Sequence, residues 1–142
     1  MKKAGLFLII AVVVVLLLPI LMRGSGKPQE ETKPLDLTIP PLVVSMNPKN
    51  GATNVPSTLT ELSVTFNQPM GSGFSWTGGG DQFPEGTGRP QWSTNMRTCT
   101  LPVKLKPHWN YRLGLNSPSH RNFRNADRVP LEPVVWRFST GE

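Results

Sequence analysis

The amino-acid sequence predicts an all-β antiparallel sandwich that follows an N-terminal membrane segment. After residue 41, apolar and polar residues alternate in several short runs, as they do in strands with one buried face. Turn-forming residues separate these runs, and the 142-residue chain contains 15 prolines and 13 glycines, too many for a helical bundle. No stretch after Met22 keeps a helical period. We therefore expect about seven strands in two facing sheets with Greek-key connections.

The predicted strands place their apolar residues on one side. The clearest runs are residues 62–66, 99–105, 110–116 and 134–140, and the weaker ones are residues 41–45, 74–76 and 89–93. Phe66, Tyr111, Trp136 and Phe138 fall on the apolar sides of these runs. We expect these four aromatic residues in the core between the two sheets.

The first 23 residues predict a signal anchor that spans a membrane. Lys2 and Lys3 precede an uncharged apolar run, residues 4–22. As a helix this run is about 28 Å long, close to the thickness of a bilayer core. The lysines favour a cytoplasmic N-terminus and an exported domain. The run is followed by a poor cleavage motif, so we expect a single-pass anchor, with secretion after cleavage as the alternative.

Residues 24–41 predict a linker between the anchor and the folded domain, which we place at residues 42–142. The linker is rich in glycine, proline and charged residues, and it has no apolar period before Leu35. Segments of this composition form extended spacers. We expect the linker to hold the domain away from the membrane.

The charge gives weak support for an anionic partner. The whole chain carries a formal charge of +6. From Pro41 onward, three lysines and seven arginines stand against two aspartates and four glutamates, an excess of four positive charges. Such an excess is compatible with an anionic surface or polymer. Export of the domain argues against nucleic acid.

The residues that could support catalysis do not form a recognisable motif. Cys99 is the single cysteine, which excludes an intrachain disulfide and a multi-cysteine metal site. It falls on the apolar side of its strand, where a free cysteine behaves as a small hydrophobe. His108 and His120 could pair with a thiol, and Ser119 adjoins His120, but no nucleophile-elbow sequence is present. We expect no catalytic site, no metal and no cofactor.

Five residues are candidates for ligand binding. Trp92 and Trp109 lie near predicted loops and could stack on sugars or anchor a protein if they are exposed. Arg121, Arg124 and Arg128 lie in one loop around an aromatic residue and could bind an anionic glycan or a lipid headgroup. A solvated loop, with Phe123 closing the end of the sandwich, is the alternative explanation.

The stretch SMNPKNGATNVP, residues 45–56, predicts a structured connection between the first two strands. Asn-Pro favours a turn, and Gly51 accepts a positive φ at little cost. The surrounding segment, residues 43–70, resembles the start of the bacterial Ig-like domains first described in a surface-layer protein, the SbsA-type family. The matching positions are Pro48, Gly51, Ala52, Val55, Pro56, Val64, Phe66, Pro69 and Met70.

The end of the chain resembles the same family in its L-x-P-x-x-x-Y segment, residues 105–111, and its closing F-x-T segment, residues 138–140. Tyr111 is placed to return its hydroxyl to upstream backbone, as in a tyrosine corner. The family's D-x-x-G turn is altered, because this chain has Asn125 and Arg128 at those positions.

The resemblance implies a non-catalytic module of the bacterial cell envelope. We expect a membrane-tethered, extracytoplasmic interaction or structural module whose partner is an unidentified envelope protein or polysaccharide. The alternative is an envelope glycan-binding module that uses exposed tryptophans and arginines.

Overall fold

The computed structural model describes residues 33–142, which contain nine strands and one short 3-10 helix. The predicted anchor and the first part of the predicted linker lie outside these residues. The strands are β1 (Val43–Asn47), β2 (Ala52–Val55), β3 (Glu61–Phe66), β4 (Trp76–Thr77), β5 (Glu85–Gly86), β6 (Gln91–Trp92), β7 (Thr98–Lys104), β8 (Asn110–Leu115) and β9 (Val134–Thr140). The 3-10 helix η1 spans Gly80–Gln82.

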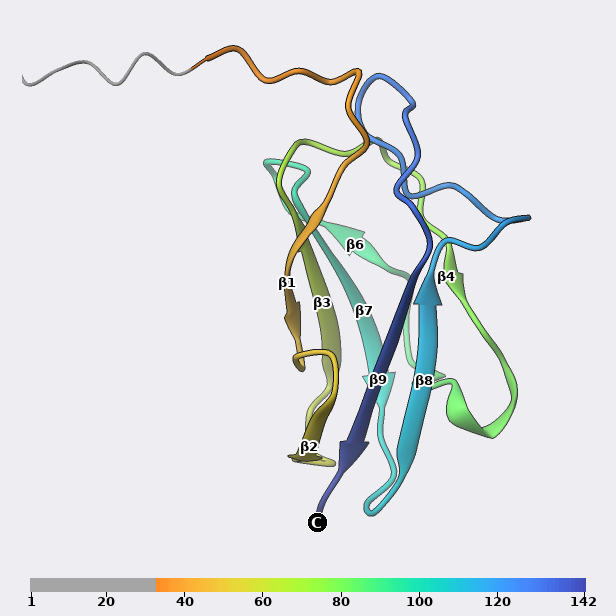
Figure 1. Cartoon of the computed structure of the whole chain (residues 1–142). Helices are drawn as coiled ribbons and strands as arrows, with labels where there is room; N and C mark the ends of the chain where they lie inside the picture. Colours follow the sequence, from red (N-terminus) through yellow and green to blue (C-terminus); the bar gives the residue numbers. More distant parts are fainter. Residues whose placement is uncertain (1–32) are drawn as a thin grey trace, which may run out of the picture. The chain divides into compact units, whose positions relative to one another are not determined.

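The strands form two sheets that face each other (Figure 1). The first sheet has the order β1-β3-β7, and β5 and β6 pair with different parts of β7. The second sheet has the order β2-β9-β8-β4. The chain passes from one sheet to the other at each connection from β1 to β5 and again between β7 and β8. The predicted all-β sandwich is confirmed.

The core lies between the sheets and is built from the predicted alternation. Phe66, Trp136 and Phe138 are almost completely buried. Phe123, from the loop before β9, is also buried and lies 5.6 Å from the Phe66 ring centre. Cys99 is buried on β7, with Leu101, Val103 and Leu105 on the same side.

Two features differ from the predicted antiparallel, seven-strand pattern. Residues 45–56 are not only a loop, because β2 lies within them and pairs in parallel with β9. The Asn50 side chain connects the two segments: its amide donates to Val135 O at 2.9 Å, and its oxygen accepts from Arg137 N at 2.8 Å. The number of strands also differs, because the glycine-rich segment 77–88 adds β5, with η1 before it.

The last residues before β1 contact the sandwich. Asn125 donates to Leu37 O at 2.7 Å, and Gln68 donates to Ile39 O at 3.1 Å. Pro41 is buried. The chain therefore enters the sandwich beside the loop that joins β8 to β9 (Figure 1). Within residues 33–142, the structure contains no helix long and apolar enough to cross a membrane.

Three residues of the 45–56 stretch, Pro48, Gly51 and Pro56, define its backbone path. Pro48 follows a cis peptide bond and is buried, and its carbonyl accepts a hydrogen bond from the Trp136 indole at 3.1 Å. Gly51 has a φ of +83°, which favours glycine. Pro56 is exposed and accepts a turn hydrogen bond from Leu59 N at 3.1 Å.

Candidate functional site

The β7–β8 turn carries Trp109. Its indole N–H donates to Asp81 O at 2.7 Å, which ties the turn to η1. The Lys106 ammonium lies 4.4 Å from the centre of the indole ring. Trp109 is half-buried, so its indole serves partly as a structural contact.

At the start of β8, the Tyr111 hydroxyl accepts a hydrogen bond from Lys106 N in the preceding turn, at 2.7 Å. Tyr111 is buried, and its ring stacks on Phe138 at 5.1 Å. The predicted return of the hydroxyl to upstream backbone is present, over five residues of chain. The bond fixes the exit of β7 relative to the start of β8.

Trp92 lies on β6, near the start of β7. Its indole N–H donates to Ser72 O at 3.2 Å. Its ring packs against Phe66 at 5.9 Å and against Phe123 at 6.0 Å. Trp92 is half-buried, and it covers the end of the core that Phe123 closes.

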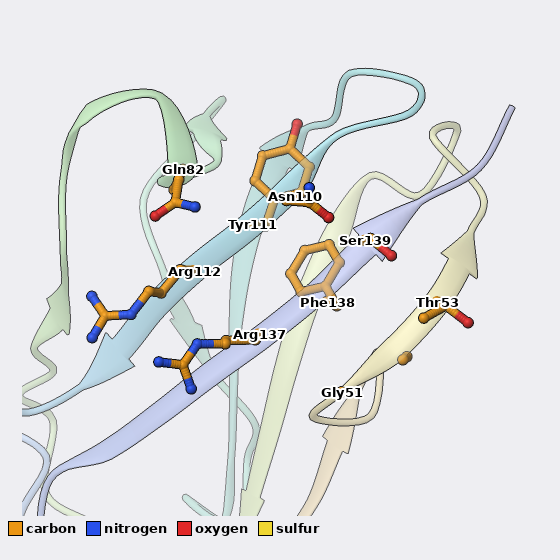
Figure 2. Close-up of a pocket in the computed structure, with 10 residues that line it drawn as sticks. Gly51, Thr53, Gln82, Asn110, Tyr111, Arg112, Arg137, Phe138 and Ser139 are labelled. Atoms are coloured by element: carbon orange, nitrogen blue, oxygen red, sulfur yellow. The ribbon is translucent and has the colours of Figure 1, made fainter.

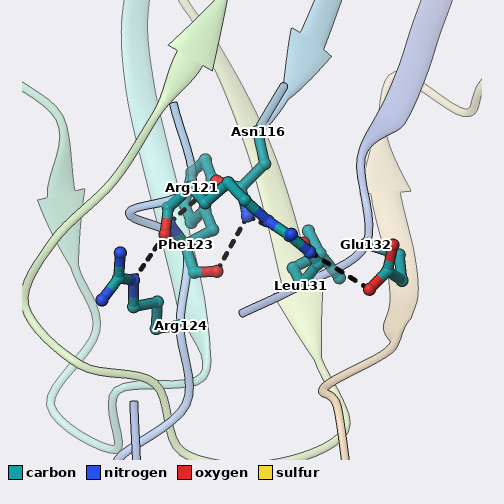
Figure 3. Close-up of polar contacts among 6 residues, drawn as sticks. All are labelled: Asn116, Arg121, Phe123, Arg124, Leu131 and Glu132. Carbon is teal, nitrogen blue, oxygen red and sulfur yellow. Dashed lines mark hydrogen bonds and ion pairs between the residues drawn. The ribbon is translucent and has the colours of Figure 1, made fainter. Parts of the chain in front are cut away.

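The arginine loop, residues 117–133, lies at the same end of the sandwich as Trp92. Arg121 forms an ion pair with Glu132 at 3.2 Å, and Arg124 donates to Arg121 O at 2.6 Å (Figure 3). Asn116 connects the two sides of the loop, because its side-chain amide donates to the Phe123 and Leu131 carbonyls, both at 2.9 Å. Two of the three candidate arginines are thus engaged within the loop itself.

Arg128 and Asn125 form the turn that departs from the family motif. The Asn125 oxygen accepts from Asp127 N at 3.0 Å and from Val129 N at 2.9 Å, as an aspartate oxygen would. Arg128 has a φ of +68°, the backbone conformation for which glycine is favoured. The turn therefore keeps its hydrogen bonds without the Asp and Gly of the motif.

The structure does not bring the five candidate residues to one surface. Trp109 precedes β8, and the arginine loop follows it. Six residues of extended strand separate the two ends by roughly 17–20 Å. Trp92 lies near the arginine loop through Phe123, so Trp92 and Trp109 do not form a pair of coplanar rings.

The residues considered for catalysis are also apart. Cys99 is 0% exposed, and burial raises the pKa of its thiol to about 12, against a smaller opposite effect of the Trp76 indole. His108 lies in the β7–β8 turn, whereas His120 lies in the arginine loop and contacts Ser119 Oγ at 3.0 Å. A thiol held in its protonated form is a poor nucleophile. Residues 33–142 contain no group of three or more acidic, histidine or cysteine side chains suited to a metal.

A different pair of side chains, Arg112 and Arg137, forms a polar surface on the second sheet. Arg112 on β8 and Arg137 on β9 are directly opposite each other in the strand register. Both are exposed and project from the face of the second sheet that points away from the core, here called the outer face (Figure 2). They line a hollow of about 370 Å³ whose rim includes Gly51, Thr53, Gln82, Asn110 and Ser139.

The strand alternation places these two arginines outside, because Tyr111, Leu113, Trp136 and Phe138 occupy the inward positions on the same strands. The sequence shows that each arginine faces outward but not that they are neighbours. That fact depends on the alignment of β8 with β9. A search for basic residues at outward positions of successive predicted strands would have found both residues.

Residues 37–140 match the family described as "Bacterial Ig-like domain". No curated protein matches the chain. Among solved structures, the S-layer protein rSbsC(31-844) and domains 1-6 of the surface layer protein SbsC are each similar to it at 18% identity and a TM-score of 0.46. Each comparison covers 72% of this chain but 14% of the S-layer chain.

The family match covers nearly all of the described residues, and the two-sheet architecture agrees with it. The chain belongs to the bacterial Ig-like domain family.

Proposed function

We propose that the protein is a membrane-tethered interaction module of the bacterial cell envelope, without catalytic activity. The observation that carries the proposal is the combination, in one chain, of an uncharged apolar run at residues 4–22 with a bacterial Ig-like domain. The run would anchor the chain, the linker would set its reach, and the sandwich would present its loops and outer face. Within the family, we assign the chain to the SbsA-type domains on the motif of residues 48–70.

Domains of this family are typically non-catalytic, and the separation of Cys99, His108 and His120 supports the same role here. The Asn125 contacts with residues 37–39 support a defined exit for the tether, beside the arginine loop.

Glycan binding through Trp92, Trp109 and the three arginines of the loop remains the second candidate. The excess of basic residues favours it, whereas the distance between the two tryptophans and the internal contacts of Arg121 and Arg124 favour it less. Substituting Trp109 by alanine would test the contribution of its indole ring to binding of an envelope polysaccharide.

A topology assay tests the tether. A glutamate-specific protease added to sealed spheroplasts is expected to cut the linker after Glu30 or Glu31 and to leave a shortened fragment that begins before the sandwich. The uncut chain is expected to sediment with membranes. Protection of the linker until the cells are lysed would contradict an extracytoplasmic domain, and recovery of the chain in the medium before protease treatment would contradict an uncleaved anchor.

A further inference from the structure

We propose that Arg112 and Arg137 bind phosphate groups of an anionic polymer. The envelope location of that polymer rests on the proposed function, whereas the binding chemistry rests on the outer face alone. The two residues are Cα partners in the β8–β9 register, and their side chains extend from the outer face toward the same side (Figure 2). A bound anion would lie between or above the two guanidinium groups.

The arrangement is unfavourable without a ligand. Like charges at directly opposite positions of adjacent strands repel each other. Among residues 33–142, neither guanidinium donates a hydrogen bond, and the one ion pair joins Arg121 to Glu132. Asp81 precedes Gln82 at the rim of the hollow but forms no ion pair with Arg112 or Arg137. Both arginines therefore keep their donors available for an external anion.

The number of donors favours phosphate over carboxylate. One arginine can satisfy both oxygens of a carboxylate with a bidentate pair of hydrogen bonds. Two facing arginines offer more donors and twice the charge, which suits the larger set of oxygens on a phosphate group. Gln82 and Asn110 add neutral amide donors on the same rim.

The shape of the outer face favours a polymer over a free ion. A second hollow of about 390 Å³ shares Arg112 with the first and continues past Gly114 and Val135 to His120. The two hollows meet at Arg112, which lines both of them. An extended chain with repeated phosphates could therefore contact the arginine pair and continue along the second hollow toward His120. The aromatic residues of these strands, Tyr111, Trp136 and Phe138, are buried, so stacking on neutral sugars is not favoured.

Isothermal titration of the purified full chain, in detergent micelles, with a short inorganic polyphosphate tests the proposal. We expect Arg112→Gln and Arg137→Gln each to weaken binding about tenfold or more, since each removes one charge-assisted contact. Arg89→Gln is the matched control, because Arg89 is exposed outside the hollow and its loss changes the net charge equally. Arg112→Lys keeps the charge but not the bidentate geometry and is expected to fall between the wild type and Arg112→Gln.

Several results would overturn the proposal. Equal weakening by Arg89→Gln would mean that only net charge matters, and no binding by the wild-type chain would mean that there is no such site. Tighter binding of polyglutamate would indicate an acidic protein partner. Tighter binding of phosphatidylglycerol vesicles, or of inorganic phosphate, would replace the polymer with a lipid surface or a free ion. Failure here leaves the protease assay of the tether unaffected, so the two proposals can fail separately.

Discussion

Replacing Asn125 by alanine should destabilise the domain through the loss of buried side-chain hydrogen bonds in the arginine loop. Asn125 is 1% exposed and connects three segments. Its oxygen accepts from Asp127 N and Val129 N, and its amide donates to Leu37 O at 2.7 Å and to Gln68 Oε1 at 3.0 Å. Alanine removes these four contacts and a longer one to Ile39 O at 3.4 Å.

The expected loss follows from the burial of each partner. The two turn amides lie near solvent, so water replaces part of their bonds and each bond contributes about 0.5–1 kcal/mol. Gln68 is 1% exposed, and its oxygen would lose a donor that water cannot easily replace, which costs about 1 kcal/mol or more. With the Leu37 contact, the free energy of unfolding should fall by about 3 kcal/mol. For a domain of this size, that corresponds to a Tm lower by roughly 10–20 °C.

Thermal unfolding followed by circular dichroism measures this change. Arg128→Gly, in the same turn, is the control, because glycine relieves the positive φ and should raise stability by about 0.5–1 kcal/mol. Hydrogen exchange of the segment before β1 should also speed up in Asn125→Ala, since Leu37 loses its contact. A Tm change of only a few degrees in Asn125→Ala, smaller than that of the control, would refute the reasoning.

Three further predictions concern other parts of the sandwich. Tyr111→Phe removes the hydrogen bond from Lys106 N and should lower stability by about 1 kcal/mol in denaturant unfolding, without altering polyphosphate binding; an unchanged midpoint would argue against the tyrosine corner. Burial raises the pKa of the Cys99 thiol from 9.0 to about 12, so the folded state keeps the proton that the unfolded state releases. Stability should therefore be independent of this thiol below pH 9 and fall between pH 9 and pH 12 by up to about 1.4 kcal/mol per pH unit, a slope absent in Cys99→Val. Arg137→Gln should raise stability at low salt by a few tenths of a kcal/mol, because it removes repulsion from Arg112, and this gain should vanish in high salt or when polyphosphate is bound to the wild type.

The core could be predicted because it depends on local alternation. The period-two pattern around Phe66, Trp136 and Phe138 fixes which side of each strand is apolar, whatever its neighbours are. β2 could not be predicted in the same way, because ATNV has no alternation and its pairing depends on the Asn50 contacts with β9, 85 and 87 residues away in the sequence. The β2 strand therefore forms because of its tertiary contacts with β9, and not because of its own composition.

Which candidate binding residues are neighbours could not be predicted from the sequence, because it depends on strand register and on the distance between loops. Trp92, Trp109 and the loop arginines are each plausible ligand contacts in isolation, but their positions at different ends of β8 follow only from the folded topology. Conversely, the neighbouring positions of Arg112 and Arg137 require the β8–β9 alignment. Asn125 shows the same limit: the altered D-x-x-G turn was visible in the sequence, but its contact with Leu37, 88 residues away, was not.

Sedimentation of the purified full chain, kept in detergent micelles, with membrane-free cell-wall fragments tests the central claim, that this sandwich is an interaction module, most directly. The account predicts that the fragments retain the wild-type chain and the Arg89→Gln chain, and that retention falls in Arg112→Gln and Arg137→Gln. Retention that survives protease treatment of the fragments but not removal of their phosphate polymers would identify the partner class. Absence of retention for the wild-type chain under all of these conditions would contradict the account and leave the domain as a scaffold.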